Sequence, residues 1–234
     1  MSGDQDDGAW DAPRPERLIE ARAAAIEALR DSGLRPVAKR LAEYYSIEGN
    51  FIGATFVELQ PIDPFAITPS DILAVRLMNA PIGARSTRRL LGSHHAALRA
   101  ALENLPLGDD LPYADQALFN AMEVLHLAVK AALDDPEVED PNPWVSTSKL
   151  CARKRPALFP VRDDKVCRYL KLLARGRRNW YRTDWQVFQA LLLDGEIVRL
   201  IDDAQAKVRE IGRTTHQVDM HRLRILDAAL WTAA

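Results

Sequence analysis

The feature that most constrains the fold of this chain is a helical spacing of apolar residues. The clearest run places Ile197, Ile201, Ala204, Val208 and Ile211 at alternating steps of four and three. That spacing puts the five side chains on one face of an α-helix, whereas a strand would need alternation every two residues. The sequence therefore predicts an all-α, multi-helix protein.

Similar patterns predict helices along most of the chain. Helices are expected from Pro15 to just before Gly33, from Val37 to Gly49, after a start signal at Thr68, after Ser86 as far as Leu102, over 118–133, and up to about Trp231. The apolar face of the first one is formed by Leu18, Ile19, Ile26 and Leu29. The Thr68 signal combines a capping Thr, a Pro and an acid, which is typical of a helix N-terminus.

The domain organisation follows from composition. The polar, acidic residues 1–14 predict a disordered tail, because they offer little burial to offset the loss of conformational entropy. Residues 15–234 are expected to form one all-helical domain, since 47% of the chain is hydrophobic. Three prolines and five acids at 134–143 mark a sub-boundary within it. Only 51–59 (FIGATFVEL) resembles a strand, and without a partner we expect an extended segment or a hairpin edge.

A sharp reversal of charge lies between Lys149 and Arg182. Twelve Lys or Arg in this stretch face only Asp163 and Asp164, a local net charge of +10 in a chain whose total is −2. Such a separation of charge makes one surface attractive to polyanions while the rest repels them. The stretch therefore predicts nucleic-acid backbone, or another polyanion, as the partner.

Residues 144–175 within this stretch predict a helix, a turn and a second helix. Ser146, Thr147 or Ser148 can cap the first helix, and prolines at 156 and 160 force the turn. Asp163 can cap the second helix, which carries Lys165 and Arg168 opposite an apolar face. A helix with one basic and one apolar face can lie along a phosphate backbone, although many surface helices share the pattern.

Other features limit the class of protein. Cys151 and Cys167 have no partner pair for a metal site, and the five histidines lack ligand spacing, so neither a metal nor a cofactor is expected. The N-terminus lacks a signal peptide and no stretch is apolar enough to span a bilayer. These features and the Ala-, Arg-, Leu- and Asp-rich composition predict a cytoplasmic bacterial protein that does not enter membranes.

Two resemblances accompany these patterns. SKLCARKRPALFPVRDDKV, with the upstream SDILAVRLMNAPIG and the terminal HRLRILDAALW, resembles a family of uncharacterised bacterial proteins whose central motif is Ser-Lys-Leu-Leu-Ala-Arg-Lys-Arg-Pro. The resemblance spans about residue 40 to the C-terminus and implies an all-helical architecture with no assigned activity.

The second resemblance is more distant and concerns the C-terminal half. The segment Pro160-Val161-Arg162-Asp163-Asp164-Lys165-Val166-Cys167-Arg168 is similar to the Pro-Val-Asp-x-x-Val-x-Arg of helix-hairpin-helix DNA glycosylases, with one extra residue before the Asp. The resemblance implies a catalytic role for Asp163 and a Schiff-base role for Lys149, fourteen residues ahead of it. The Gly-x-Gly of the hairpin, which binds a phosphate, is absent here.

The candidate site residues follow from these two sources. The resemblance implies Asp163 and Lys149 as catalytic residues, because a carboxylate stabilises the positive charge that develops on a sugar during N-glycosidic cleavage. Residues expected to contact nucleic acid are Ser148, Arg153, Lys154, Arg155, Lys165, Arg168, Arg175, Arg178 and Trp180. The last of these offers a ring on which a base can stack.

Two functions stay open at this point. One is a protein that binds DNA backbone through the basic surface at 149–182, with or without glycosylase-like activity. The other is a non-catalytic helical protein whose basic segment binds an acidic partner or its own acidic segment at 134–140. Each candidate residue also has an ordinary structural role, with Asp163 as a helix cap and Lys149 as a surface lysine.

Overall fold

The computed structural model describes residues 10–30, 35–134, 143–172, 180–211 and 221–234, and these residues contain eleven α-helices and no strand, which confirms the all-α prediction. The α-helices are α1 (Pro15–Leu29), α2 (Val37–Tyr45), α3 (Pro69–Leu77), α4 (Ala84–Arg88), α5 (His95–Glu103), α6 (Gln116–Leu133), α7 (Trp144–Lys154), α8 (Asp164–Tyr169), α9 (Trp180–Leu193), α10 (Gly195–Ile211) and α11 (Arg222–Ala233). Shorter turns are η1 (Ile52–Ala54), the π-helical η2 (Arg89–Ser93) and η3 (Leu111–Tyr113).

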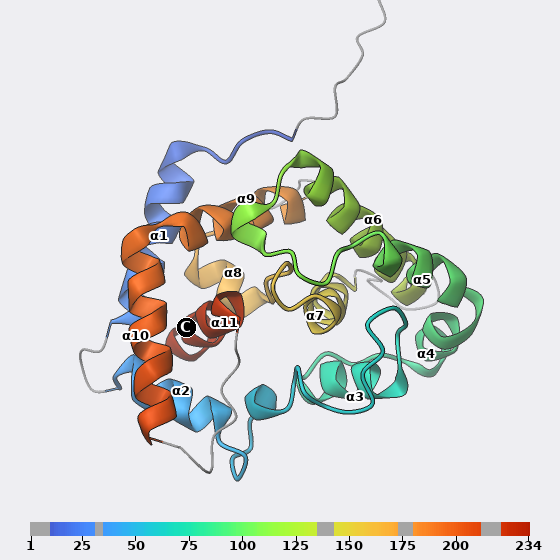
Figure 1. The fold of residues 1–234 in the computed structure, drawn as a ribbon, viewed down its shortest axis with the longest axis horizontal. Coiled ribbons are helices and arrows are strands. Elements are labelled where there is room, and N and C mark those ends of the chain that lie inside the picture. The colour runs from blue at the N-terminus through green and yellow to red at the C-terminus, as the bar shows by residue number, and fades with distance from the viewer. Residues whose placement is uncertain (1–9, 31–34, 135–142, 173–179, 212–220) are drawn as a thin grey trace, which may run out of the picture.

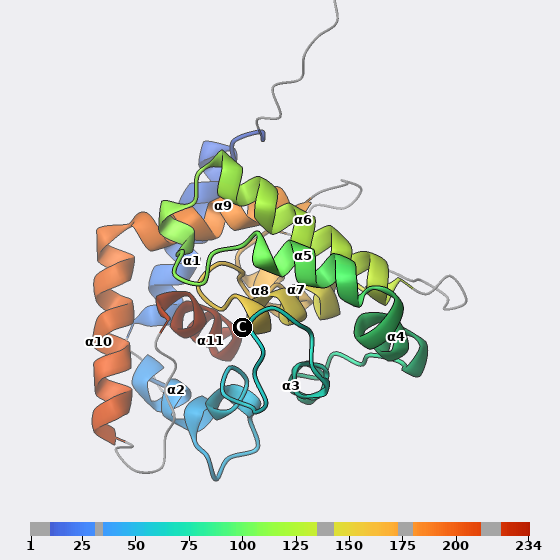
Figure 2. The same cartoon turned by 45° about the vertical axis from the view of Figure 1, so that its right-hand side comes forward.

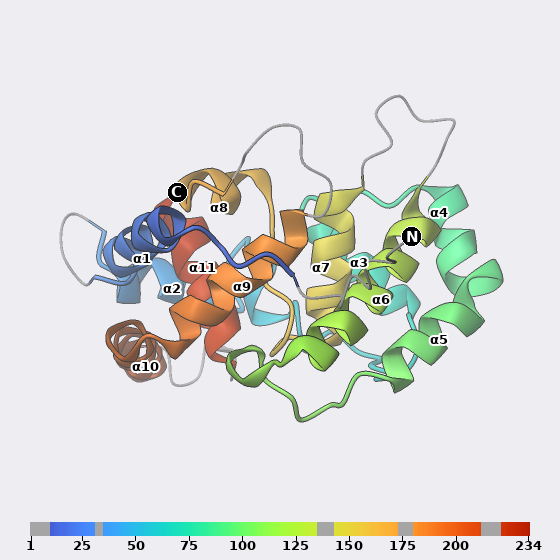
Figure 3. The same cartoon turned by 90° about the horizontal axis from the view of Figure 1, so that it is seen from above.

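The helices form two groups that lie side by side (Figures 1 and 2). In one group α1 and α2, from the start of the chain, pack against α10 and α11 from its end. In the other, α6 packs against both α5 and α7, and α7 also packs against α3. Figure 3 shows α7 in the middle of the molecule, on the side of the second group that faces the first. The helices on either side of the expected sub-boundary at 134–143, α6 and α7, pack against each other.

One continuous hydrophobic core runs through both groups of helices. Leu41 of α2 and Leu125 of α6 are each fully buried in it. Phe159, from the segment that follows α7, meets Trp185 of α9 edge to face with ring centroids 5.3 Å apart. Burial of such large rings stabilises by about 2–3 kcal/mol each. The core therefore fixes the position of α7 and of the segment after it.

Local capping signals in the sequence set several helix starts. Thr68 and Asp71 form the predicted capping box at α3, with the backbone N–H of Thr68 donating to Asp71 Oδ2 at 2.8 Å. Asp163 caps α8 by accepting the Val166 N–H at 2.9 Å. The prediction that Ser146, Thr147 or Ser148 caps α7 is wrong. Pro143 is the N-cap, and these three residues lie inside the helix.

The expected extended segment at 51–59 is wrong. Residues Ile52–Ala54 form a 3₁₀ turn, and both Thr55 and Phe56 donate their N–H to Ile52 O at 2.8 Å. Local turns satisfy this backbone because no neighbouring strand is present among the described residues. Gly53 permits the close packing, since a Cβ at this position would lie 2.4 Å from the Tyr44 ring.

Smaller differences concern individual helix positions and the N-terminal tail. Ile19 of α1 and Ile211 of α10 were expected on apolar faces but are 68% and 60% exposed. Ser86 was expected to cap a helix but lies within α4 and donates to Leu133 O at 3.1 Å. In the expected N-terminal tail, residues 1–9 lie outside the described part, while Trp10 packs on Phe119 with centroids 5.1 Å apart.

Candidate functional site: a lysine–aspartate pair beside an aromatic pocket

The basic block on α7 is buried rather than displayed. Arg153, Lys154 and Arg155 are 3–6% exposed, and Ser148 is 3% exposed. The expectation that these four residues form a nucleic-acid surface therefore does not match their position. A phosphate backbone reaches side chains only at the molecular surface.

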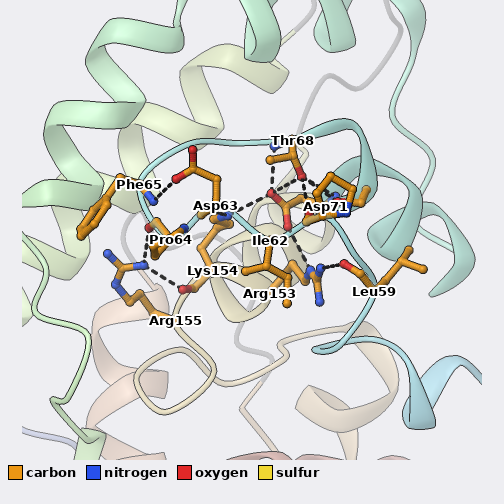
Figure 4. Close-up of polar contacts among 12 residues, drawn as sticks. Leu59, Ile62, Asp63, Pro64, Phe65, Thr68, Asp71, Arg153, Lys154 and Arg155 are labelled. Carbon is orange, nitrogen blue, oxygen red and sulfur yellow. Dashed lines mark hydrogen bonds and ion pairs between the residues drawn. The ribbon is translucent and has the colours of Figure 1, made fainter.

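Asp71 is the acid that compensates this block (Figure 4). Its fully buried carboxylate lies 3.0 Å from Arg153 Nε and 3.0 Å from Lys154 Nζ. The sequence left open that these cations pair with acids at 134–140, and of that segment only Asp134 is among the described residues. Asp71 stands more than eighty positions before Arg153 and Lys154 in the sequence, so nothing local in the sequence indicated this pairing.

The same cations hold the chain that leads from η1 to α3. Arg153 donates to Phe56 O at 2.6 Å and also to Leu59 O, while Lys154 donates to Asp63 O. Arg155 donates to Pro64 O at 2.8 Å (Figure 4). Hydrogen bonds from charged donors to buried carbonyls contribute about 1.5–3 kcal/mol each. The block thus fixes a loop that has little regular structure of its own.

The remaining predicted nucleic-acid residues have different positions. Lys165 and Arg168 are exposed on α8, as expected for residues that could meet a polyanion. Trp180 is half-buried at the start of α9. Arg175 and Arg178 lie outside the described residues. Among the described candidate residues, Lys165 and Arg168 of α8 are therefore the ones that are exposed at the surface.

Lys149 and Asp163 come together because the segment between α7 and α8 is fastened at both sides. Ser148 Oγ donates to Pro160 O at 3.0 Å and accepts the Arg162 N–H at 2.8 Å. The Val161 N–H donates to Asp227 Oδ2 of α11 at 3.0 Å. Ser148 thus serves a structural role. Its two hydrogen bonds hold the segment before α8 against α7, next to the Lys149 side chain.

The resulting pair is buried and incompletely closed. Lys149 Nζ lies 3.8 Å from Asp163 Oδ2, which is an ion pair but too long for a direct hydrogen bond. The ammonium donates instead to Met78 O at 2.9 Å. Burial lowers the pKa of Lys149 below its ordinary value, and the nearby Asp163 carboxylate opposes that effect only in part. Asp163 also caps α8, as the sequence predicted for its structural role.

A pocket of about 200 Å³ opens beside Lys149, at the junction of the two helix groups. Its wall is formed mainly by Tyr44, Phe51, Met78, Lys149, Val166 and Trp231. The Phe51 and Trp231 rings meet edge to face at 5.6 Å, and Tyr44 stacks on Phe51 at 6.0 Å. An apolar cavity of about 150 Å³ accepts benzene, so this one is suited to a planar ring system.

Sequence reasoning missed the aromatic residues of this pocket. Tyr44 was interpreted as a helix residue, Phe51 as part of the extended segment and Trp231 as the helix end. These three positions lie on α2, before η1 and on α11. Nothing in the sequence indicates that they meet, because the arrangement depends on packing the start of the chain against its end.

Neither a metal nor a membrane site emerges from the part of the chain that the structure describes. Among these residues no three His, Cys, Asp or Glu side chains are grouped closely enough to hold a metal ion. No described helix is both long enough and apolar enough to cross a bilayer. Cys151 and Cys167 are free and buried, and burial raises the pKa of each thiol, to about 12 for Cys167.

Comparison with known proteins gives one match. A family model described as a family of unknown function (DUF6308) matches residues 37–234, which include every helix from α2 to α11. No curated protein and no solved structure matches the chain significantly. The expected likeness to an uncharacterised family agrees with this match.

Proposed function

The chain belongs to this family of unknown function, and we propose that it binds DNA and cleaves an N-glycosidic bond, with Asp163 and Lys149 at the reacting sugar. The observation that carries the proposal is the approach of Lys149 Nζ to within 3.8 Å of Asp163 Oδ2 beside a ring-sized pocket. A buried amine with a carboxylate next to it can serve two chemical roles at one carbon atom, and the amine also lines the pocket.

The pocket supports a base as the group that leaves. Its aromatic wall offers Tyr44, Phe51 and Trp231, and each ring can stack on a planar heterocycle. The volume of about 200 Å³ limits the occupant to one or two fused rings. A base seated there would place its sugar towards Lys149, which lines the same pocket.

The proposed reaction is hydrolysis of the bond between the sugar C1′ and the base nitrogen. That bond breaks with its electron pair going to the base, and the positive charge on the sugar is stabilised by the Asp163 carboxylate. Water adds to C1′ and gives one proton to Asp163, and that proton then passes on to the departing base, so that Asp163 is again a carboxylate. The products are a sugar hydroxyl and a free base.

Lys149 gives this site a second route. Its lowered pKa raises the share of neutral amine, which can attack C1′ in place of water. The amine nitrogen then bonds to C1′ as the base leaves with the electron pair of its bond, and one N–H proton passes to the base. The C1′–O4′ bond opens next, O4′ takes the second N–H proton, and the C1′=N bond of a Schiff base forms. Water hydrolyses this intermediate and returns the free lysine.

Contact with the DNA backbone is assigned to α8. Lys165 and Arg168 are exposed on this helix, and Asp163 is its N-cap. A backbone phosphate at these cations would lie near the reacting sugar. Such contacts lose affinity steeply as salt rises, by nearly one power of the salt concentration per phosphate neutralised.

The test combines binding with base release. A labelled duplex, intact or with an abasic-site analogue, is titrated by fluorescence anisotropy at about 50–300 mM salt, and panels of damaged bases are assayed for release. We expect Asp163→Asn to abolish release and retain binding. Asp164→Asn, which changes the neighbouring exposed acid, serves as the matched control. Borohydride trapping that disappears in Lys149→Met would assign the amine route, whereas parallel loss of binding and release in Asp163→Asn would refute the proposal.

A second candidate function is a non-catalytic helical protein, and the burial of Arg153, Lys154 and Arg155 favours it. These cations bind the protein's own segment between η1 and α3. That agrees with an internal role for the basic segment, although the acid involved is not at 134–140. Absence of DNA binding at about 50 mM salt, with no base released, would select this function.

A further inference from the structure

Lys165 makes an unusual pair of contacts with the end of the last helix. Its Nζ donates to Trp231 O at 2.7 Å and also lies 4.3 Å from the centroid of the Trp231 ring. Trp231 is in the final turn of α11, where helix carbonyls have no donor within the helix. A cation at this end also meets the negative pole of the helix dipole. One exposed side chain therefore holds both the backbone and the ring of Trp231.

Trp231 is part of the pocket wall as well. Its ring lies 5.6 Å from that of Phe51 and 5.9 Å from that of Tyr44, and all three line the pocket. Phe51 is 44% exposed, so this aromatic wall stands at the mouth of the pocket rather than at its floor. Lys165 thus contacts a residue of the pocket mouth.

We propose that Lys165 is a positioning residue that couples anion binding to access to the pocket. A phosphate that binds the Lys165 ammonium competes with Trp231 O and with the indole face. Trp231 is then released and the mouth widens. Lys165 lines a surface groove together with Arg168, which lies one helical turn further on and supplies a second cation. The Asp164 carboxylate also lines this groove and limits how strongly an anion binds there.

The proposal depends on the proposed function only for the source of the phosphate. In a nucleic-acid enzyme the anion is a backbone phosphodiester, and coupling would open the pocket only when a strand is bound. The contact itself is independent of any reaction, so it can be tested without substrate turnover.

Acrylamide quenching of tryptophan fluorescence tests the contact. The fluorescence due to Trp231 is obtained by subtracting, for each protein, the signal of the same protein that also carries Trp231→Phe. We expect Lys165→Met to raise the fraction of released indole about tenfold, because a cation–π contact and a hydrogen bond are lost together. Lys165→Arg should restore protection. Arg168→Met is the matched control, since it removes a neighbouring cation that does not contact Trp231. Equal quenching in wild type and Lys165→Met would overturn the proposal.

Two anions then distinguish the source of the phosphate. Inorganic phosphate and the abasic-analogue duplex are each added to wild type and to Lys165→Met. Increased quenching in wild type alone, by either anion, supports the coupling, and an effect of the duplex alone assigns the backbone as its source. No effect of either anion overturns the coupling. Running the same series on Asp163→Asn separates this result from failure of the proposed reaction, because that variant leaves Lys165 and Trp231 unchanged.

Discussion

Replacing Asp71 by Asn should unfold the protein at markedly lower denaturant concentration. The carboxylate is fully buried and compensates two cations, Arg153 and Lys154, whose side chains are 1% and 2% exposed. Asn keeps the shape of the side chain and one acceptor oxygen for the Thr68 N–H, but removes the charge. The amide would also direct a donor at one of the two cations. Two buried positive charges are then left without their acid.

The expected loss is about 3–5 kcal/mol, the usual cost of removing one partner from a buried ion pair. That is a large part of the roughly 5–15 kcal/mol that holds a domain together. The assay is urea unfolding followed by circular dichroism, with Glu103→Gln as control. Glu103 pairs with Arg99 on the surface of α5, with both side chains about half exposed, so its loss should stay below about 0.5 kcal/mol. A loss of less than about 1 kcal/mol in Asp71→Asn would refute the reasoning.

Three further predictions concern the pocket and pH. Gly53→Ala should cost about 1–3 kcal/mol, measured by the same unfolding assay, because the new Cβ would lie 2.4 Å from the Tyr44 ring. His126 is buried and its pKa is lowered to about 3. As the pH falls, His126 therefore takes up a proton in the unfolded chain before it does so in the folded protein. The contribution of neutral His126 to the free energy of unfolding is fully present above about pH 6.5 and should fall by up to about 1.4 kcal/mol per pH unit towards pH 3. This contribution should be absent in His126→Phe, as urea unfolding at each pH will show. The yield of borohydride trapping at Lys149 should rise with pH and level off below the ordinary lysine pKa of about 10.4, since the amine loses its proton early; a yield still rising above that value would contradict a lowered pKa.

Local signals explain which parts of the fold could be predicted from the sequence. The capping box at Thr68 and the cap at Asp163 act over three residues, so the sequence alone locates those helix starts. Apolar spacing likewise identified Ile197, Ile201 and Val208 as buried. Ile211 continues the same spacing but is exposed, because helix ends often extend past the core.

Long-range pairing explains what could not be predicted. The charge of residues 149–182 suggested a surface, yet several of its cations are buried against acids from distant positions, as in the pair between Arg162 Nε and Asp184 Oδ2 at 2.7 Å. A run of cations has the same sequence whether its acids come from a partner or from another helix. The pocket was missed for the same reason, since Trp231 and Tyr44 meet only after the two ends of the chain pack together.

The two buried lysine–aspartate pairs, Lys154–Asp71 and Lys149–Asp163, differ in a way that distinguishes a structural ion pair from a candidate functional one. Lys154 Nζ contacts Asp71 at 3.0 Å, within hydrogen-bond distance, whereas Lys149 Nζ stands 3.8 Å from Asp163 beside a pocket. Asn caps a helix about as well as Asp, so Asp163→Asn should keep the Val166 N–H bonded. The Lys149 ammonium loses a carboxylate at 3.8 Å but keeps its hydrogen bond to Met78 O, so the loss of stability should stay well below that of Asp71→Asn. Asp71→Asn should lose several times more. A buried charge that can be removed with little loss of stability is the pattern expected of a functional site. Equal destabilisation by the two substitutions would instead identify Asp163 as a second structural anchor, and the case for chemistry at Lys149 would fall with it.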